Sequence, residues 1–161
     1  MHSPSSDNPG QAASRVGEPP RSSPERIVMD TNVAMDLWLF CNPRVQALRE
    51  ALRLRRFAWI VTPAMLTELA HVRGRPFPAR YRALPEWTEP PAHCIEPPPT
   101  SAPWRCRDRS DQMFIDLAWQ WRCPLLTRDR HLLSLRRKAS SVGTPILTPE
   151  QGLVLIPPGH P

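Results

Sequence analysis

The chain has 161 residues, 40% of them apolar, a composition that suits one domain with a buried core. None of its apolar runs approaches the roughly 20 residues that cross a membrane, so no membrane partner is expected. The net charge of +6 is equally consistent with binding to a polyanion and with solubility alone, and we leave both open.

The first 24 residues are polar, rich in Ser, Pro and Gly, and lack the apolar stretch of a secretion signal. They cannot bury enough apolar surface to fold, which predicts a disordered tail over residues 1–24. We expect one folded domain over residues 25–156 and a flexible tail over residues 157–161. The cysteines show neither C-x-x-C pairing nor zinc-like spacing, so we expect free thiols and a cytoplasmic protein. These cysteines are Cys41, Cys94, Cys106 and Cys123.

The first predicted element of the folded domain is the apolar run 27–29, which is too short for a helix and typical of a buried parallel strand. The run ends at Asp30-Thr31-Asn32, three polar residues that favour a helix start. We expect a helix over residues 33–40 that ends before Asn42-Pro43. A second helix is predicted over residues 43–55, with Pro in its first turn.

The next buried strand is predicted over residues 57–61, and Thr62-Pro63 then starts a helix that turns Met65, Leu66 and Leu69 inward. Glu68 lies beside this apolar stripe rather than opposite it. The Arg- and Pro-rich segment 73–104 gives weaker signals, for a short helix over 78–84 and a third strand over 93–95.

Ser110-Asp111-Gln112 opens another helix, in which Phe114, Leu117, Ala118 and Trp121 recur on one face. A fourth strand is predicted over residues 124–127, just before Asp129. A brief helix over 131–137 and a last strand over 145–147 follow. This alternation predicts an α/β fold whose central, mostly parallel sheet of about four or five strands is covered on both faces.

Four acids are placed to meet at one edge of that sheet. Asp30 and Asp129 follow strands, Asp111 begins a helix, and Glu68 lies in the helix after the second strand. Function in open parallel sheets gathers at the carboxyl ends of the strands. Carboxylates that meet there repel one another, and a hard cation such as Mg²⁺ or Mn²⁺ relieves the repulsion. A cation of this kind in a basic protein suggests phosphodiester hydrolysis.

The segments IVMDTNVAMDLWL, TPAMLTELAHV, CRDRSDQMFIDLAWQWRCPLLTRDRHLL and TPILTPEQGL, in this order, resemble the PIN domain. They are most similar to its bacterial, VapC-like branch of toxins from toxin–antitoxin systems, over roughly residues 26–153. The resemblance implies a three-layer α/β/α domain that cleaves RNA with Mg²⁺ or Mn²⁺. It also implies a homodimer that is blocked by a small antitoxin protein.

By this resemblance the four acids are catalytic, and Asp30 and Asp111 bind the ion most directly. Asn32 and Thr127 match positions that orient the acids or their waters. Arg128 replaces the glycine that the family usually has before its last acid. We expect Arg128 and Arg130 to contact the phosphates of the substrate instead.

Structural alternatives remain open for each acid. Asp30 is also suited to capping the next helix, Asp129 to a turn in which it pairs with Arg128 or Arg130, and Glu68 to a solvated helix surface. Asp108 is an alternative to Asp111, and Asp111 is suited to a helix start. Trp119 and Trp121 suit either stacking on bases or packing in the core or a dimer.

Two other functions remain as alternatives to the ribonuclease. The Arg128 departure favours a catalytically degenerate PIN domain that binds RNA or a protein without cutting. A phosphohydrolase of another α/β fold ranks lower, because Asp30 is not followed by the D-x-D-x-T pattern of such enzymes.

Overall fold

The computed structural model describes residues 25–78 and 92–156. The predicted tails over residues 1–24 and 157–161 lie outside the described residues, as does nearly all of the short helix predicted over 78–84. No helix in the described segments has both the length and the apolar character needed to cross a membrane.

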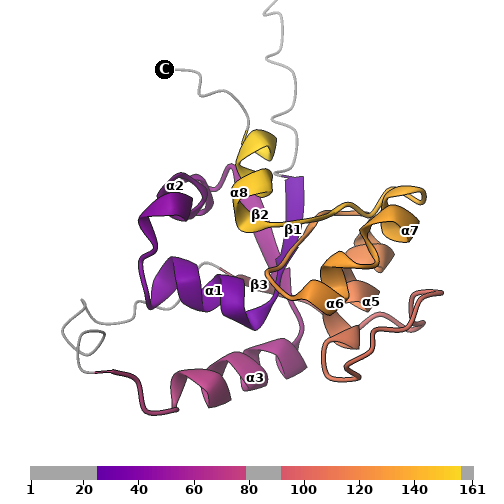
Figure 1. Cartoon of the computed structure of the whole chain (residues 1–161), viewed down its shortest axis with the longest axis horizontal. Coiled ribbons are helices and arrows are strands. Elements are labelled where there is room, and N and C mark those ends of the chain that lie inside the picture. Colours follow the sequence, from indigo (N-terminus) through magenta and orange to yellow (C-terminus); the bar gives the residue numbers. More distant parts are fainter. Residues whose placement is uncertain (1–24, 79–91, 157–161) are drawn as a thin grey trace, which may run out of the picture.

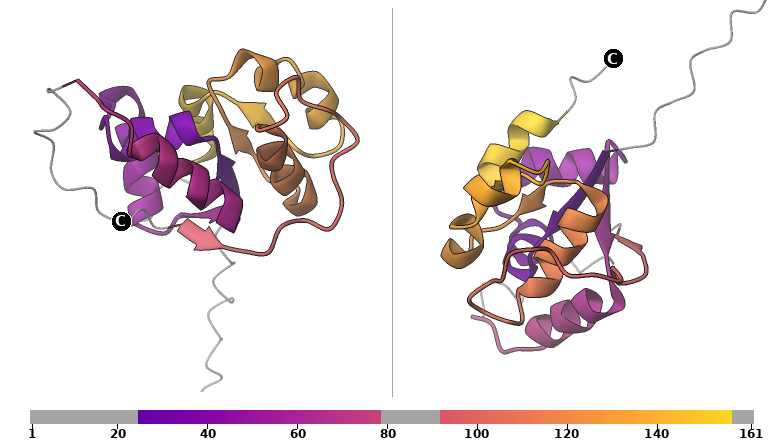
Figure 2. Two further views of the ribbon diagram at one scale, coloured as in Figure 1. Left: turned by 90° about the horizontal axis from the view of Figure 1, so that it is seen from below. Right: turned by 90° about the vertical axis from the view of Figure 1, so that its right-hand side faces the viewer.

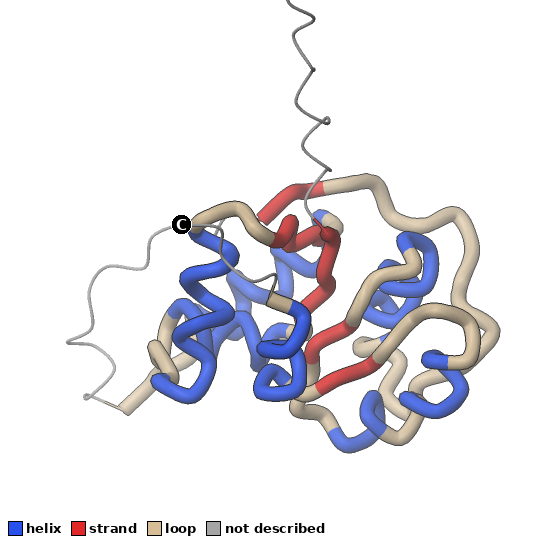
Figure 3. The backbone as a smooth tube through the Cα atoms, turned by 90° about the horizontal axis from the view of Figure 1, so that it is seen from above, coloured by secondary structure: helices blue, strands red, loops and turns tan. Residues whose placement is uncertain are grey.

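One sheet of five parallel strands, in the order β3-β2-β1-β4-β5, forms the centre of the domain (Figure 3). The prediction of a mostly parallel sheet is confirmed, and every pairing is parallel. The apolar strands are buried on both faces, as a parallel sheet between helices requires. The strands are β1 (Glu25–Met29), β2 (Phe57–Val61), β3 (Ala92–Cys94), β4 (Leu125–Leu126) and β5 (Ile146–Leu147).

Helices cover both faces of the sheet, which gives the predicted three layers (Figures 1 and 2). One layer contains α1 (Thr31–Trp38), the 3₁₀ turn η1 (Pro43–Val45), α2 (Gln46–Arg53) and α3 (Pro63–Arg73). The other contains α5 (Gln112–Trp121), α6 (Arg130–Leu133) and α7 (Arg136–Ser140). The chain ends its described part with α8 (Pro149–Gly152), which packs against β5 and η1, and η2 (Leu153–Leu155).

Capping side chains fix where several helices start. The Asp30 carboxylate accepts a hydrogen bond from the backbone of α1, and Thr62 does so for α3. Thr148 caps α8 in the same way, with Pro149 at the first helical position. α8 is not among the helices predicted from the sequence, although Thr148-Pro149 repeats the Thr62-Pro63 signal that predicts α3.

Two predicted helices are shorter than their periodicity suggested. The helix predicted over 43–55 begins with the 3₁₀ turn η1 and ends at Arg53. The helix predicted over 131–137 is two short helices, α6 and α7. Near the end of α6, the Ser134 hydroxyl donates to the His131 carbonyl at 2.6 Å, which gives the backbone a local alternative to a continuous helix.

The apolar face of α5 packs into the core, but Trp121 does not. Phe114, Leu117 and Ala118 are at most 2% exposed, whereas Trp121 is 40% exposed. The Arg26 guanidinium lies 4.5 Å from the centre of the Trp121 ring, a cation–π contact at the surface. The prediction that Trp121 packs in the core is therefore wrong, because this side chain lies in the last turn of α5 beside a charged partner. Whether it packs in a dimer stays a prediction.

Candidate functional site

The strand order places a crevice at the carboxyl edge of the sheet, between β1 and β4. The chain leaves β1 toward β2 on one side, whereas β4 pairs with β1 on the other side. Loops that follow two such strands diverge, and open α/β sheets bind their ligands at this point. Asp30 directly follows β1, and Asp129 follows β4 in the neighbouring loop.

A cavity of about 190 Å³ opens at this edge, and we call it the acidic cleft. All four predicted acids line it, although they come from four separate segments. The predicted orienting residue Asn32 also lines it, and among the described residues its side chain makes no hydrogen bond to an acid. The lining consists of Asp30, Thr31, Asn32, Glu68, Val72, Arg75, Asp111, Phe114 and Asp129.

Asp30 is the most deeply held of these acids and is only 4% exposed. Its Oδ1 accepts from the Val33 backbone N–H at 2.8 Å, so the capping role considered for Asp30 is real. Its Oδ2 accepts from the Thr127 hydroxyl and, at 3.4 Å, from the Arg128 backbone N–H. Burial nevertheless raises the pKa of Asp30 above its ordinary value, because the hydrogen bonds offset burial only in part. Asp30 thus caps α1 and lines the acidic cleft at once.

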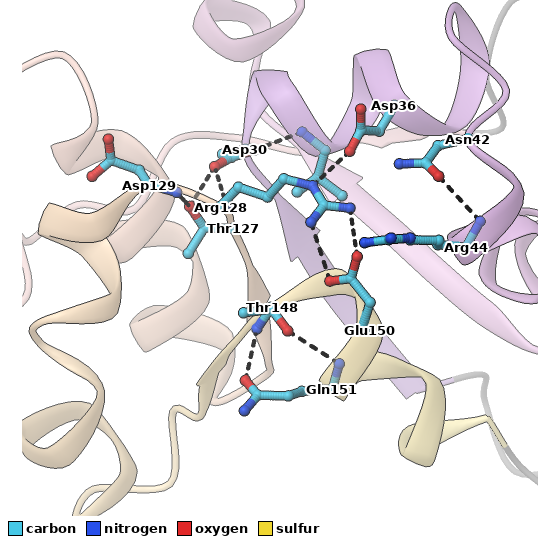
Figure 4. Close-up of polar contacts among 11 residues, drawn as sticks. Asp30, Asp36, Asn42, Arg44, Thr127, Arg128, Asp129, Thr148, Glu150 and Gln151 are labelled. Carbon is cyan, nitrogen blue, oxygen red and sulfur yellow. Dashed lines mark hydrogen bonds and ion pairs between the residues drawn. The ribbon is translucent and has the colours of Figure 1, made fainter.

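The buried Thr127 side chain connects two of the acids, as Figure 4 shows. Its hydroxyl donates to Asp30 and accepts from the Asp129 backbone N–H at 2.9 Å. These contacts fit the orienting position that the resemblance gave to Thr127. A hydroxyl used as both donor and acceptor fixes the loop after β4 relative to the end of β1.

Thr31 holds Glu68 toward the cleft, a contact that the sequence analysis missed. The Thr31 hydroxyl donates to Glu68 Oε1 at 2.9 Å and joins the start of α1 to the middle of α3. Glu68 is therefore engaged at the cleft rather than only solvated on a helix surface. The sequence did contain a signal for this contact. Thr31 directly follows Asp30 at the end of the first strand, so its hydroxyl lies at the same edge of the sheet as the acids.

Asp111 differs from Asp30 and Asp129 because its carboxylate does not cap a helix. It occupies the N-cap position of α5, yet its side chain makes no capping hydrogen bond. Its pKa is raised to about 6, chiefly by burial and then by the negative charges of Asp108, Asp129, Glu68 and Asp30. A carboxylate in a cleft of like charges, with no helix cap to form, is suited to bind a cation.

Asp108, the alternative to Asp111, does not line the acidic cleft. Its exposed carboxylate accepts from the Ser110 backbone N–H at 2.9 Å and from the Ser110 hydroxyl at 2.7 Å. These hydrogen bonds lower the pKa of Asp108. The geometry therefore favours Asp111 over Asp108 as the site residue.

Asp129 caps α6 through one oxygen. Its Oδ1 accepts from the backbone N–H groups of His131 at 2.6 Å and Leu132 at 3.1 Å. In the described part of the chain its Oδ2 has no hydrogen-bond partner and remains available to the cleft. The considered pairing of Asp129 with Arg128 or Arg130 does not occur there.

Arg128 makes contacts different from the predicted ones. Its Nε donates to Asp36 at 2.6 Å, and its terminal nitrogens donate to Glu150 at 2.8 and 3.2 Å. Figure 4 shows the guanidinium directed toward α1 and α8, away from Asp129. The expected contact of Arg128 with phosphate stays untested, and it would require the guanidinium to release one of the two acids that occupy its fork. Arg130 is exposed and does not line the cleft, so its contact with substrate stays a prediction.

Arg75 lines the acidic cleft and was missed by the sequence analysis. It is exposed, and within the described ranges no carboxylate lies close enough to form an ion pair with it. It belongs to the Arg- and Pro-rich segment 73–104, where nothing in the sequence separates one arginine from another. Its guanidinium is the one positive side chain in this lining, beside four carboxylates.

The donor set of the cleft fits a hydrated divalent ion. Over residues 25–78 and 92–156, no three His, Cys, Asp or Glu side chains are arranged to hold one ion together. Mg²⁺ usually keeps several waters and binds through only one or two carboxylates. The oxygens of Asp30, Asp111 and Asp129 suit this mode, in which the remaining acids bind the waters of the ion.

The Asp111→Asn variant is expected to stabilise the metal-free protein at pH 7.5. Because the pKa of about 6 exceeds the ordinary 3.8, the folded chain holds this proton more tightly than the unfolded chain does. The resulting stability is fully present below pH 4 and is lost as the pH rises through 6. Partial exposure of Asp111 reduces the full effect, so we expect a gain of about 1–2 kcal/mol.

Urea denaturation in EDTA, at pH 4 and at pH 7.5, measures this gain. Asp111→Asn and the wild type should have similar free energies of unfolding at pH 4 and differ at pH 7.5. A difference that does not grow with pH would show that Asp111 is not under electrostatic strain.

Comparison with known proteins adds one finding. A family model described as PIN domain matches residues 26–131, more than half of the chain. The matched region contains all four acids of the cleft as well as Thr31, Arg75 and Thr127. No curated protein matches the chain.

Proposed function

The chain belongs to the PIN domain family, and on this premise we propose that it is an endoribonuclease that depends on Mg²⁺ or Mn²⁺. PIN domains are generally nucleases, which sets the coarse class. One observation supports the finer proposal most strongly. Four carboxylates from separate segments line one cleft at the carboxyl edge of the sheet.

Each of the four acids of the cleft has a role in this proposal. Asp30 and Asp111 would hold the ion, which supplies Lewis-acid stabilisation of the charge that develops on the scissile phosphate. Asp129, through the Oδ2 that does not cap α6, orients the attacking water or takes its proton. Glu68, held by Thr31, acts in the same way from α3.

Arg75 is proposed to bind the substrate phosphate. Its guanidinium is free of ion pairs in the described part of the chain, and such a group forks onto phosphate oxygens. The acids repel a polyanion, so a positive side chain in the same cleft lowers the cost of bringing the phosphate to them. Arg75 thus takes the phosphate-binding role that the sequence suggests for Arg128.

The basic surplus of the chain supports a nucleic-acid substrate, since each neutralised phosphate releases counterions. RNA as the substrate, and a toxin role in a toxin–antitoxin system, follow from the resemblance to the VapC-like branch. The same resemblance proposes a homodimer, an antitoxin partner and a cytoplasmic location. A small upstream reading frame with a ribbon-type DNA-binding pattern would support the toxin role.

The degenerate PIN domain was proposed because Arg128 replaces a glycine. The Arg128 side chain pairs with Asp36 and Glu150 and does not line the acidic cleft. The side chain that replaces the glycine therefore leaves the acids of the cleft uncovered, which supports the active enzyme over the degenerate domain.

Removal of divalent ions is expected to abolish cleavage. The full chain with Mg²⁺ or Mn²⁺ should cut a 5′-labelled, unstructured RNA into internal fragments, as gel electrophoresis resolves them. EDTA should stop the reaction, and excess Mn²⁺ should restore it. A single-stranded DNA of the same sequence should be cut far more slowly.

Two results would overturn this proposal. Cleavage that continues unchanged in EDTA would exclude the metal mechanism. A chain that cuts no RNA with either ion would leave the degenerate, RNA-binding domain as the better account.

A further inference from the structure

A second cavity, of about 420 Å³, opens next to the acidic cleft. Arg105, Cys106, Arg109 and Gln112 line it, and we call it the arginine pocket. Gln112 directly follows Asp111 in the chain, so the two cavities share the start of α5. We propose that the arginine pocket binds a backbone phosphate of the RNA strand, one that flanks the cleaved bond, and this inference rests on the proposed function.

The wall of the arginine pocket is fixed to α5 by the side chain of Gln112. Its Oε1 accepts from the Cys106 backbone N–H at 2.8 Å, and its Nε2 donates to the Trp104 carbonyl at 3.0 Å. Nε2 also donates to Asp116 at 2.8 Å, and Asp116 accepts from the Ala102 backbone N–H. The amide of Gln112 thus anchors a loop that would otherwise be free to move.

Burial reinforces this anchoring. Ala102 is 3% exposed and Cys106 is 7% exposed, and both pack against the hydrophobic core. Arg105 lies immediately before the buried Cys106, so its backbone has little freedom. A charged side chain on a fixed backbone loses less entropy when it binds a ligand.

Within residues 25–78 and 92–156, the two arginines of the pocket lack acidic partners. Arg105 and Arg109 are exposed, and no ion pair among the described residues includes either of them. The nearby Asp108 directs its carboxylate to Ser110 instead. Two free guanidinium groups at one cavity repel each other, and a bound anion removes that repulsion. The phosphodiester is the anion whose oxygens match their fork geometry.

The position of the pocket identifies which anion it would receive. Cys106 lies close enough to the cleft for the charges of Asp111 and Asp129 to act on it. A single strand with one phosphate at Arg75 and the acids therefore continues past the start of α5 toward Arg105 and Arg109. The pocket would add affinity and set the direction of the strand without touching the cleaved bond.

The test compares two pairs of arginine substitutions in a binding assay. The full chain is titrated into a fluorescein-labelled 12-nucleotide oligouridylate in EDTA, and anisotropy reports affinity at several salt concentrations. Arg105→Gln/Arg109→Gln removes the pocket charges. Arg136→Gln/Arg137→Gln on α7 removes the same charge from exposed positions that line neither cavity.

Loss of one phosphate contact should weaken binding of the 12-mer roughly fivefold at 0.1 M salt. It should also lower the slope of log K against log salt by about 0.7. The α7 pair should change both quantities much less. Circular dichroism should show the wild-type fold for both variants, because the substituted side chains are exposed. An Arg105→Lys/Arg109→Lys variant should recover most of the salt slope but only part of the affinity.

Equal affinity and slope in the pocket variant and the α7 variant would overturn the inference, as would a wild-type chain that does not bind the 12-mer. Because the assay contains EDTA, it does not depend on cleavage. Weakened binding in the pocket variant of a chain that never cuts RNA would reject the ribonuclease and keep the pocket. If the chain cuts RNA and the pocket variant binds the 12-mer as the wild type does, the ribonuclease proposal stands and the phosphate site in the arginine pocket is rejected.

Discussion

Replacing Asp111 with Asn is expected to slow RNA cleavage at least about 100-fold without unfolding the protein. The Asp111 side chain makes no capping hydrogen bond, so Asn removes a charge and little else. The same substitution should stabilise the metal-free fold, as its raised pKa implies. A variant that is more stable and far less active is the signature of a residue placed for function rather than for folding.

Asp108→Asn is the matched control for this experiment. It removes the same charge three positions earlier, from an exposed side chain that does not line the acidic cleft. We expect Asp108→Asn to keep cleavage within a few-fold of the wild-type rate. If both variants are equally slow, general charge rather than a site accounts for the effect. If only Asp108→Asn is slow, the two acids have been assigned the wrong way round.

Asp30→Asn is also expected to abolish cleavage, but this variant reports on structure as well. In the wild type the Thr127 hydroxyl donates to Asp30. In the variant the Asn side chain still accepts from Val33, but its NH₂ group faces the Thr127 hydroxyl, so two donors meet. Thr127 would have to reorient and weaken its link to Asp129. Asp30→Asn is therefore the less clean probe of the two, although both acids are assigned to the ion.

The sequence was sufficient to predict the sheet and the meeting of the acids. Short apolar runs at residues 27–29 and 57–61 have few interpretations other than buried strands, and both are strands in the structure. Asp30 follows one strand directly, which fixes it at the carboxyl edge whatever the details of packing. When an acid directly follows a strand or begins a helix, its place in the sequence is thus enough to predict where it lies in the fold.

Contacts between distant segments could not be predicted in this way. Thr31 and Glu68 lie 37 positions apart, and their hydrogen bond depends on how α3 packs against α1. Arg75 resembles the other arginines of its segment until the fold places it in the cleft. Arg128 was expected to contact phosphate because it neighbours Asp129 in sequence, whereas its long side chain reaches Asp36 and Glu150 instead.

The Arg128 contacts also explain how the departure from the family pattern is accommodated. The Arg128 guanidinium forms ion pairs with Asp36 of α1 and Glu150 of α8, and it thereby joins both helices to the loop after β4. The backbone N–H of the same residue donates to Asp30. Arg128 therefore supports the position of the cleft from outside, and the larger side chain costs the cleft no volume.

The proposed function requires the carboxylates of the acidic cleft to share one divalent ion. Isothermal titration calorimetry with Mn²⁺ tests this requirement most directly. Mn²⁺ accepts the same oxygen ligands as Mg²⁺, and its binding requires neither RNA nor turnover. The comparison uses the wild type, Asp108→Asn, and the double variant Asp30→Asn/Asp111→Asn. Denaturation curves on the same samples verify that each protein is folded.

The wild type and Asp108→Asn should each bind one Mn²⁺ ion weakly but measurably. The double variant should bind it at least about 100-fold more weakly, because both direct ligands have lost their charge. Undiminished Mn²⁺ binding by a folded double variant, or no binding by the wild type, would contradict the shared metal site on which the proposed ribonuclease depends.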